Sequence, residues 1–359
     1  MKKTGFMGSG SNVRGFVAMA VVTICVALFA APASAFATTW EWLYGTTALD
    51  TMSAVASAEQ VFSSNRGGTV IVATSDSYYD ALSASGLAGL KDAPILLTNG
   101  KALSSQTKAE LKRINPQCVD IIGGTGAVSE TVENSIRKIL PGAGIARVWG
   151  QTMTDTANEI ASDLLEEDSY GSTCFIATSK GYQDALSAAP YAYANKCPIF
   201  LTEGDGTLSE STLKTIRNGH FTNCYILGGV NAVPQSTMNL VANSCGISNV
   251  DRIWGNSAID TSQAVAEFEL ENGMTVKHMG VATVNGFEDA LSGAALCGKS
   301  NSILVLVATS DQTCVNTIVA DNADEIETGY IFGGPGAVSN STVSNLKAKT
   351  GGNVIEMVK

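Results

Sequence analysis

The sequence predicts an α/β fold made of three tandem domains, each with a small parallel sheet covered by helices on both faces. The first observation behind this prediction is a set of motifs that recurs at an interval of 104 or 105 residues. A period of that length exceeds the roughly 20–50 residues of a solenoid unit and suits an independently folding domain. The second observation is that continuous apolar runs alternate with amphipathic segments, which is typical of parallel strands joined by helices. The motifs are G-x4-D-T from Gly45, Gly150 and Gly255; D-A-L-S from Asp80, Asp184 and Asp289; and I-x-G-G-x-x-A-V around Gly123, Gly228 and Gly333.

The first repeat shows the expected elements of one domain in order. Short apolar runs that end in polar or glycine-rich turns predict strands, and segments with apolar residues at helical spacing predict helices. The strands are expected at 69–73, 93–98 and 119–122, and the helices at 79–90, 101–114 and 128–139. The second and third repeats copy this pattern, with strands expected at 173–177, 197–201 and 225–227 and at 279–282, 303–307 and 330–332.

A short apolar segment joins neighbouring repeats and predicts an extended strand. It reads R-V-W-G up to Gly150 and R-I-W-G up to Gly255; W-L-Y-G up to Gly45 and the last residues of the chain share its frame. Such short joints predict repeats that are pressed together, and we expect a compact three-lobed assembly with the joining strands near its middle. The expected domains are a signal peptide at 1–37 and repeats at 43–147, 148–252 and 253–359.

The N-terminus has the pattern of a secretory signal peptide. Three basic residues precede an apolar run at 15–30, and the small residues A-S-A follow at 33–35. This predicts cleavage after Ala35 or Ala37 and a secreted protein. A signal anchor is the alternative, although the apolar run is short for a membrane span of about 20 residues. We expect no other membrane span.

Charge and cysteine usage exclude several classes of protein. Without the predicted signal peptide, 19 basic and 33 acidic residues leave a net charge of −14, which argues against nucleic-acid binding. Seven cysteines remain, at positions that do not repeat, so they do not form a framework of disulfides common to the repeats. Cys174 and Cys224 fall at strand starts and are expected to be small buried residues. No C-x-x-C motif supports structural zinc.

The recurring loops follow the expected strands, where open parallel sheets bind their ligands. Each contains a glycine pair that can turn the chain tightly or offer backbone N–H groups to an anion at a helix N-terminus. Each D-A-L-S aspartate falls in the first turn of a helix, where it complements the helix dipole; a role in ligand or cation binding is the alternative. The G-x4-D-T motif is expected to cap the helix that it opens. The glycine pairs are Gly123 and Gly124, Gly228 and Gly229, and Gly333 and Gly334.

No catalytic set is visible in the sequence. His220 and His278 are the only histidines, and neither recurs nor stands in a metal-binding motif such as H-E-x-x-H. A nucleophile elbow is also missing, so the sequence shows no residues that would catalyse acyl transfer. A carboxylate pair of a glycoside hydrolase remains an open alternative. Threefold repetition, in contrast, favours avid binding to a repetitive polymer.

These motifs, taken together, resemble the cell-wall-binding repeat 2 family of Gram-positive bacteria over residues 43 to 359. The resemblance implies Rossmann-like modules that work in threes around a pseudo-threefold axis. It also implies non-covalent anchoring of a surface protein to an anionic secondary polymer of the cell wall, teichoic-acid-like or polysaccharide. In that family the triplet often accompanies an effector domain such as an amidase, for which we expect no room here.

The chain departs from the family at the G-x4-D-T motif. Family members commonly have the sequence G-A-D-R-Y-x-T at this place. The arginine position is occupied in this chain by Ala48, Met153 and Ala258. With a negative net charge, recognition of a polyanion needs local donors or a bridging divalent cation; no other cofactor is expected. Arg147 and Arg252, in the joining segments, are the best candidates for direct contacts, and the alternative is that they pair with neighbouring carboxylates.

We therefore expect a secreted, non-enzymatic wall-anchoring or S-layer-like protein at the cell surface of a Gram-positive bacterium. Its tentative polymer-binding residues are the two arginines, the three D-A-L-S aspartates and the three glycine pairs. The alternatives are a wall-remodelling hydrolase and a module for protein–protein contact on the cell surface. The sequence leaves the polymer, the oligomeric state and the disulfides open.

Overall fold

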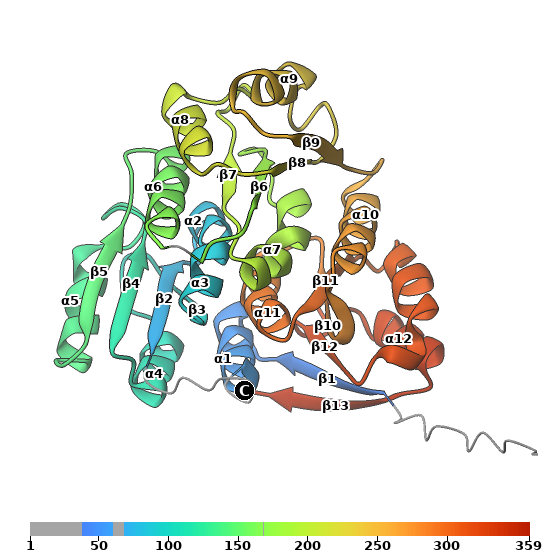
Figure 1. The fold of residues 1–359 in the computed structure, drawn as a ribbon. Coiled ribbons are helices and arrows are strands. Elements are labelled where there is room, and N and C mark those ends of the chain that lie inside the picture. The colour runs from blue at the N-terminus through green and yellow to red at the C-terminus, as the bar shows by residue number, and fades with distance from the viewer. Residues whose placement is uncertain (1–37, 60–67, 168) are drawn as a thin grey trace, which may run out of the picture. The chain divides into compact units, whose positions relative to one another are not determined.

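The computed structural model describes residues 38–359 except 60–67 and 168, all within one compact unit, Phe36–Lys359. The predicted signal peptide lies outside the described residues and stays a prediction. In the described part of the chain, no helix combines the length and apolar character needed to cross a membrane. Three small parallel sheets with interleaved helices make up the unit (Figure 1), which confirms the predicted fold class.

The first repeat contains a four-stranded parallel sheet in the order β3-β2-β4-β5. Its strands are β2 (Thr69–Thr74), β3 (Ile95–Thr98), β4 (Cys118–Ile122) and β5 (Gly144–Val148). The helices before and within it are α1 (Ala48–Glu59), α2 (Tyr79–Ser83), α3 (Ser85–Leu90), α4 (Ser105–Ile114) and α5 (Glu130–Ile139). Helix α4 begins at Ser105 rather than at Lys101, because the Asn99 side chain accepts the Lys101 N–H and holds a turn there.

The second repeat forms an equivalent sheet in the order β7-β6-β8-β9. Its strands are β6 (Thr173–Ala177), β7 (Ile199–Leu201), β8 (Asn223–Leu227) and β9 (Asn249–Ile253). Its helices are α6 (Met153–Leu165), α7 (Gln183–Asn195), α8 (Glu210–Asn218) and α9 (Gln235–Ser244). Cys174 and Cys224 are fully buried partners on β6 and β8 and are free thiols, as predicted for small buried residues.

The third sheet has the order β11-β10-β12-β1-β13, so the first and last described strands both belong to it. Its strands are β1 (Thr39–Tyr44), β10 (Thr275–Thr283), β11 (Ser302–Val307), β12 (Thr328–Phe332) and β13 (Asn353–Val358). Nearby lie α10 (Ala258–Glu271), α11 (Glu288–Lys299), the π-helical turn η2 (Val315–Val319), the 3₁₀ turn η3 (Ala323–Glu325) and α12 (Asn340–Thr350). Strand β1 pairs with β12 as β5 pairs with β4 and β9 with β8. The N-terminal strand therefore completes the C-terminal repeat.

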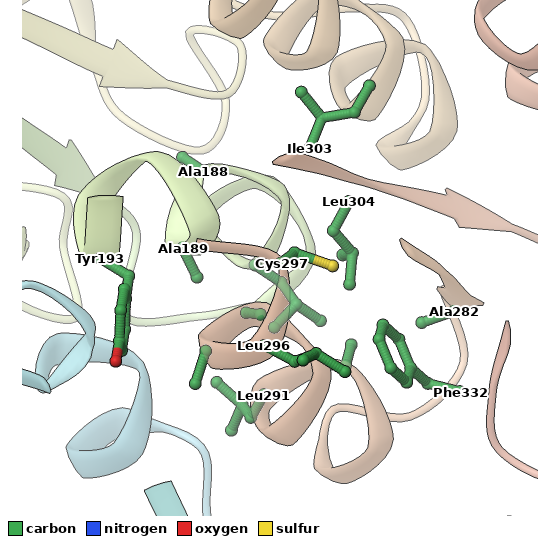
Figure 2. Close-up of a cluster of buried hydrophobic side chains, with 14 of the residues drawn as sticks. Ala188, Ala189, Tyr193, Ala282, Leu291, Leu296, Cys297, Ile303, Leu304 and Phe332 are labelled. Atoms are coloured by element: carbon green, nitrogen blue, oxygen red, sulfur yellow. The ribbon is translucent and has the colours of Figure 1, made fainter. Parts of the chain in front are cut away.

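The three repeats pack through helices rather than through sheets. Helices α3, α7 and α11, one from each repeat, contact one another, and their side chains share a buried apolar cluster with strands of all three sheets. Figure 2 shows Ala188 and Ala189 of α7 with Leu296 and Cys297 of α11 in this cluster. The first helix of each repeat also packs on a helix of another repeat. Helix α6 packs on α2 and α3, α10 packs on α7, and α1 packs on α11. These contacts form a closed cycle, as expected for a pseudo-threefold trimer of repeats.

The joining strands do not lie near the middle of this assembly, and that expectation is wrong. Strands β5 and β9 are edge strands whose first four residues are alternately exposed and part-buried, while their last residues, Val148 and Ile253, are buried in the shared apolar cluster. In each strand the part-buried residues lie on one face and the exposed residues on the other, which suits a strand with one covered face. Helix α3, which follows the D-A-L-S motif, and helices α7 and α11, which contain it, consist mainly of apolar or small residues and take the central position instead.

Candidate functional site

Strand ends, D-A-L-S aspartates and joining strands meet at three equivalent places, which we call junctions. Each is built around the first glycine of a G-G pair, which has a positive φ of 99°, 94° or 98° at Gly123, Gly228 and Gly333. The N–H of each donates to a joining strand: to the Val148 O at 2.9 Å, the Ile253 O at 2.9 Å and the Leu43 O at 3.1 Å. Junction 1 comprises Asp80, Gly123, Gly124, Arg147 and Trp149; junction 2 Asp184, Gly228, Gly229, Arg252 and Trp254; junction 3 Asp289, Gly333, Gly334, Trp42 and Tyr44.

The D-A-L-S aspartates lie directly against these glycines. A β-carbon at Gly123 would come within 2.3 Å of Asp80 Oδ2, and the corresponding distances at junctions 2 and 3 are 2.2 and 2.4 Å. Glycine is therefore required both by the positive φ and by the neighbouring carboxyl group. Burial raises the pKa of Asp80 and of Asp289 to about 6 each. Burial also raises the pKa of Asp184, and the nearby Thr261 hydroxyl offsets part of that rise.

The two candidate arginines hold the glycine turns from the other side. Arg147 Nη1 donates to the Gly123 O at 2.7 Å, and Arg252 Nη1 donates to the Gly228 O at 2.6 Å. Arg147 also pairs with Glu133 on α5 at 2.8 Å, and its side chain is only 13% exposed. At junction 3 the same carbonyl accepts the indole N–H of Trp42 at 2.7 Å. In the repeat pattern Trp42 stands at the position of these arginines, and it donates the equivalent hydrogen bond to the first glycine of its pair.

An aromatic side chain covers the second glycine of each pair. Three atoms of the Trp149 ring lie 3.2–3.9 Å from where a β-carbon of Gly124 would be; Trp254 lies 3.6 Å from the same point at Gly229, and Tyr44 3.2 Å from it at Gly334. Trp149 and Trp254 are each 52% exposed. Beside them lie cavities of about 340 Å³ at junction 1 and about 420 Å³ at junction 2. Each cavity is lined by residues of two successive repeats, so it exists only because the repeats pack together.

The G-x4-D-T motif closes the far side of these cavities, and its predicted capping role is confirmed. Thr152 and Asp155 form a capping box at the start of α6, and Ser257 and Asp260 form another at the start of α10. The threonine after each aspartate accepts the N–H of the glycine that opens the motif, at 3.0 Å in Thr156 and 3.1 Å in Thr261. The motif thus fixes the turn between a joining strand and the next helix.

Among the described residues Arg252 has no carboxylate partner, unlike Arg147, and this difference gives a test of the ion pair. Its Nε and Nη2 atoms are buried without a hydrogen-bond partner, and Met238 stands on α9 where the first repeat has Glu133. We expect Met238→Glu to raise the free energy of unfolding by about 1 kcal/mol, because a charge-assisted hydrogen bond replaces an orphaned donor. The reciprocal Glu133→Met should lower it by about 2 kcal/mol. Urea denaturation of both variants measures this; equal stability of Met238→Glu and the unmodified chain would refute it.

The sequence missed the exposed tryptophans as site residues, because an apolar strand suggests burial. The signal that identifies them is the W-G dipeptide that closes each internal joining strand at Gly150 and Gly255. Among the described residues, no group of three or more His, Cys, Asp or Glu side chains is placed to hold a metal ion. Each junction brings together the predicted aspartate and glycine pair, joined at junctions 1 and 2 by the predicted arginine. Their role in binding a ligand stays a prediction.

The fold and junctions define a class of protein: an α/β protein of three repeats, with pockets where successive repeats meet. The chain belongs to the cell wall binding domain 2 family, whose profile matches residues 43–133, 147–238 and 252–343. The resemblance inferred from the sequence is thus confirmed, and membership in this family associates the chain with the cell wall.

Relatives with known names agree with this assignment. The N-acetylmuramoyl-L-alanine amidase LytC of Bacillus subtilis (strain 168) is 29% identical over 311 residues, which are 84% of this chain and 57% of that protein. The amidase enhancer of the same organism is 29% identical over 257 residues, 71% of this chain and 33% of its own length. The chain therefore spans about half or less of these relatives. The structure of Cwp6 from Clostridium difficile shares the fold, with a TM-score of 0.74 and 23% identity over 86% of this chain and 48% of that one.

Proposed function

We propose that this chain attaches non-covalently to the bacterial cell wall by binding an anionic secondary wall polymer, and that it serves as a surface or S-layer-like protein. The observation that carries the proposal is the pair of equivalent pockets at junctions 1 and 2, in a chain of the cell wall binding domain 2 family. Two similar pockets in a fixed arrangement suit a polymer with a repeating unit, because the second contact is intramolecular once the first has formed.

The charges near the pockets constrain how a polyanion would be held. None of the described residues that line the two pockets is a lysine or an arginine, and the guanidinium of Arg147 is occupied by Glu133 and by the Gly123 carbonyl. The N–H of the first glycine is likewise bonded to a joining strand. Contacts to the polymer would then come from side-chain hydroxyl and amide groups and from other backbone N–H groups. Alternatively, a divalent cation would bridge the polymer to a junction carboxylate.

Co-sedimentation with purified cell walls tests the proposal. We expect the chain to pellet with intact walls and to stay in solution when the secondary polymer has been stripped from them. Binding that survives polymer removal would contradict the proposed ligand. Because one relative is named as an amidase, the same samples should also be assayed for release of peptidoglycan fragments. Turnover by the purified chain would favour a hydrolase instead.

A further inference from the structure

We infer that Trp149 and Trp254 are stacking platforms for uncharged sugar rings, so that junctions 1 and 2 each bind one sugar unit of a wall glycan. This inference rests on the proposed function and deepens it: the pockets recognise the sugar part of the polymer rather than its charge. The contact would place the apolar face of a sugar ring against the exposed indole, while its hydroxyl groups meet the polar wall of the pocket.

The position and exposure of the two indole rings support stacking against a sugar. Each ring is backed by a glycine, Gly124 or Gly229, so the backbone holds it at a fixed place. Each is nevertheless 52% exposed, and the two values are equal although the residues belong to different joints. Large aromatic side chains that stay exposed beside a cavity are typical of binding sites, because a ligand that covers them removes apolar surface from water and so gains binding free energy.

The polar residues that line the two pockets support recognition of an uncharged sugar. The pocket at junction 1 is lined by Ser77, Thr125, Gln151 and Thr152, and Asp80 is the one carboxyl group among its described lining residues, with a pKa that burial raises to about 6. Junction 2 offers the same kind of neutral groups: Gln183, Asn231, Asn256 and Ser257, beside Asp184. Hydroxyl and amide groups that both donate and accept suit the hydroxyls of a sugar. Because the described lining residues of both pockets include no basic side chain, a phosphate or carboxylate would lack a charged partner there.

Junction 3 supplies an internal contrast. There the platform position holds Tyr44, whose hydroxyl donates to Glu356 Oε2 on β13 at 2.8 Å. Strand β13 runs beside Tyr44, and the N–H of Lys359, which follows β13, donates to the Tyr44 carbonyl at 3.1 Å. An added strand therefore occupies the flank that stays open beside Trp149 and Trp254. We assign sugar binding to the first two junctions and not to the third.

Tryptophan fluorescence tests the stacking directly. The chain has four tryptophans, and Trp40 and Trp42 are at most 4% exposed, so a solvent-dependent change in emission reports Trp149 and Trp254. The probe is the soluble polysaccharide released from purified walls by mild acid and then desalted. We expect a blue shift and protection from iodide quenching that persist in 0.5 M NaCl, and no change with inorganic phosphate. Unaltered emission at saturation, or a response abolished by salt, would overturn the inference.

Substitutions separate this inference from the proposed function. Trp149→Ala and Trp254→Ala should each weaken polysaccharide binding about tenfold, and the double variant should lose wall binding because avidity is lost too. Trp149→Phe should stay within about threefold of the unmodified chain, since it keeps a platform. Leu240→Ala, an exposed apolar residue on α9 outside both pockets, is the matched control. If the double variant binds walls as the unmodified chain does, the inference fails alone; if the unmodified chain does not bind walls, the proposed function fails.

Discussion

Gly89→Ala is expected to destabilise the chain by about 3 kcal/mol or more, because it forces two central helices apart. Gly89 lies on α3 where this helix crosses the end of α7, and a β-carbon there would come within 1.8 Å of the Tyr193 carbonyl oxygen. Overpacking a core usually costs about 1–3 kcal/mol, and here the obstacle is backbone that cannot rotate away. The higher helix propensity of alanine, worth about 1 kcal/mol, offsets only part of this cost.

Urea denaturation followed by circular dichroism measures this effect, and Gly142→Ala is the control. Gly142 lies in the loop before β5, and a β-carbon there would have nothing within 4 Å. We expect Gly142→Ala to change the free energy of unfolding by less than about 0.5 kcal/mol. If Gly89→Ala were equally harmless, the close packing of α3 on α7 would be wrong, and with it the position of the repeats around a shared centre.

Acidification from pH 7.5 to pH 5 is expected to stabilise the chain by several kcal/mol, opposite to the usual effect of acid on carboxylates. Burial raises the pKa of Asp80 and Asp289 to about 6 from 3.8, and that of Glu59 to about 7 from 4.5. Between about pH 4 and pH 7 the folded state therefore holds more protons than the unfolded state, so the free energy of unfolding falls as pH rises. Each pKa unit corresponds to about 1.4 kcal/mol.

Carboxyl groups with a lowered pKa work in the other direction but in a lower pH window. His278, whose pKa burial lowers from 6.5, opposes part of the effect near pH 6. Hydrogen bonds from Gln106 and Thr47 lower the pKa of Asp50, and those from Arg137 and Arg147 lower that of Glu133. Their ordinary pKa values are 3.8 and 4.5, so their stabilising effect is lost only as the pH falls below about 4.5. Stability should thus be greatest near pH 5.

Thermal unfolding at several pH values, with Asp80→Asn and Asp289→Asn combined, measures the carboxyl effect. The double variant should be more stable than the unmodified chain at pH 7.5 and should show a shallower dependence on pH. Asp205→Asn, at a fully exposed carboxyl group, should leave the profile above pH 5 unchanged. A stability that rises between pH 5 and pH 7.5 in the unmodified chain would contradict the burial of the junction carboxyls.

The elements of the fold could be predicted because each strand is a local apolar run and each turn has its own glycine or capping residue. The third repeat shows where local information ends. The frame shared by Trp42 and Arg147 was visible, but the pairing of β1 with β12 joins segments at opposite ends of the chain. The position of the joining strands was mispredicted for the same reason. Whether an apolar segment lies at a sheet edge or in the centre depends on what packs against it.

At the junctions the sequence identified the groups but not their partners. It placed Asp80 and Gly123 at neighbouring strand ends, and the structure brings them into contact. It could not show that Arg147 donates to the Gly123 carbonyl, since that bond depends on the register of β5 beside β4. The exposure of Trp149 was also out of reach, because it follows from the edge position of β5. Periodicity shows which residues share a face, and packing decides which face is covered.

The most direct test of the central claim compares wall binding by the unmodified chain and by the Trp149→Ala/Trp254→Ala variant, on walls with and without the secondary polymer. We expect only the unmodified chain to pellet, and only with intact walls, while circular dichroism shows both proteins folded. Undiminished pelleting of the variant would remove junctions 1 and 2 from the binding surface. Pelleting of both proteins with stripped walls would show that the polymer is not the ligand.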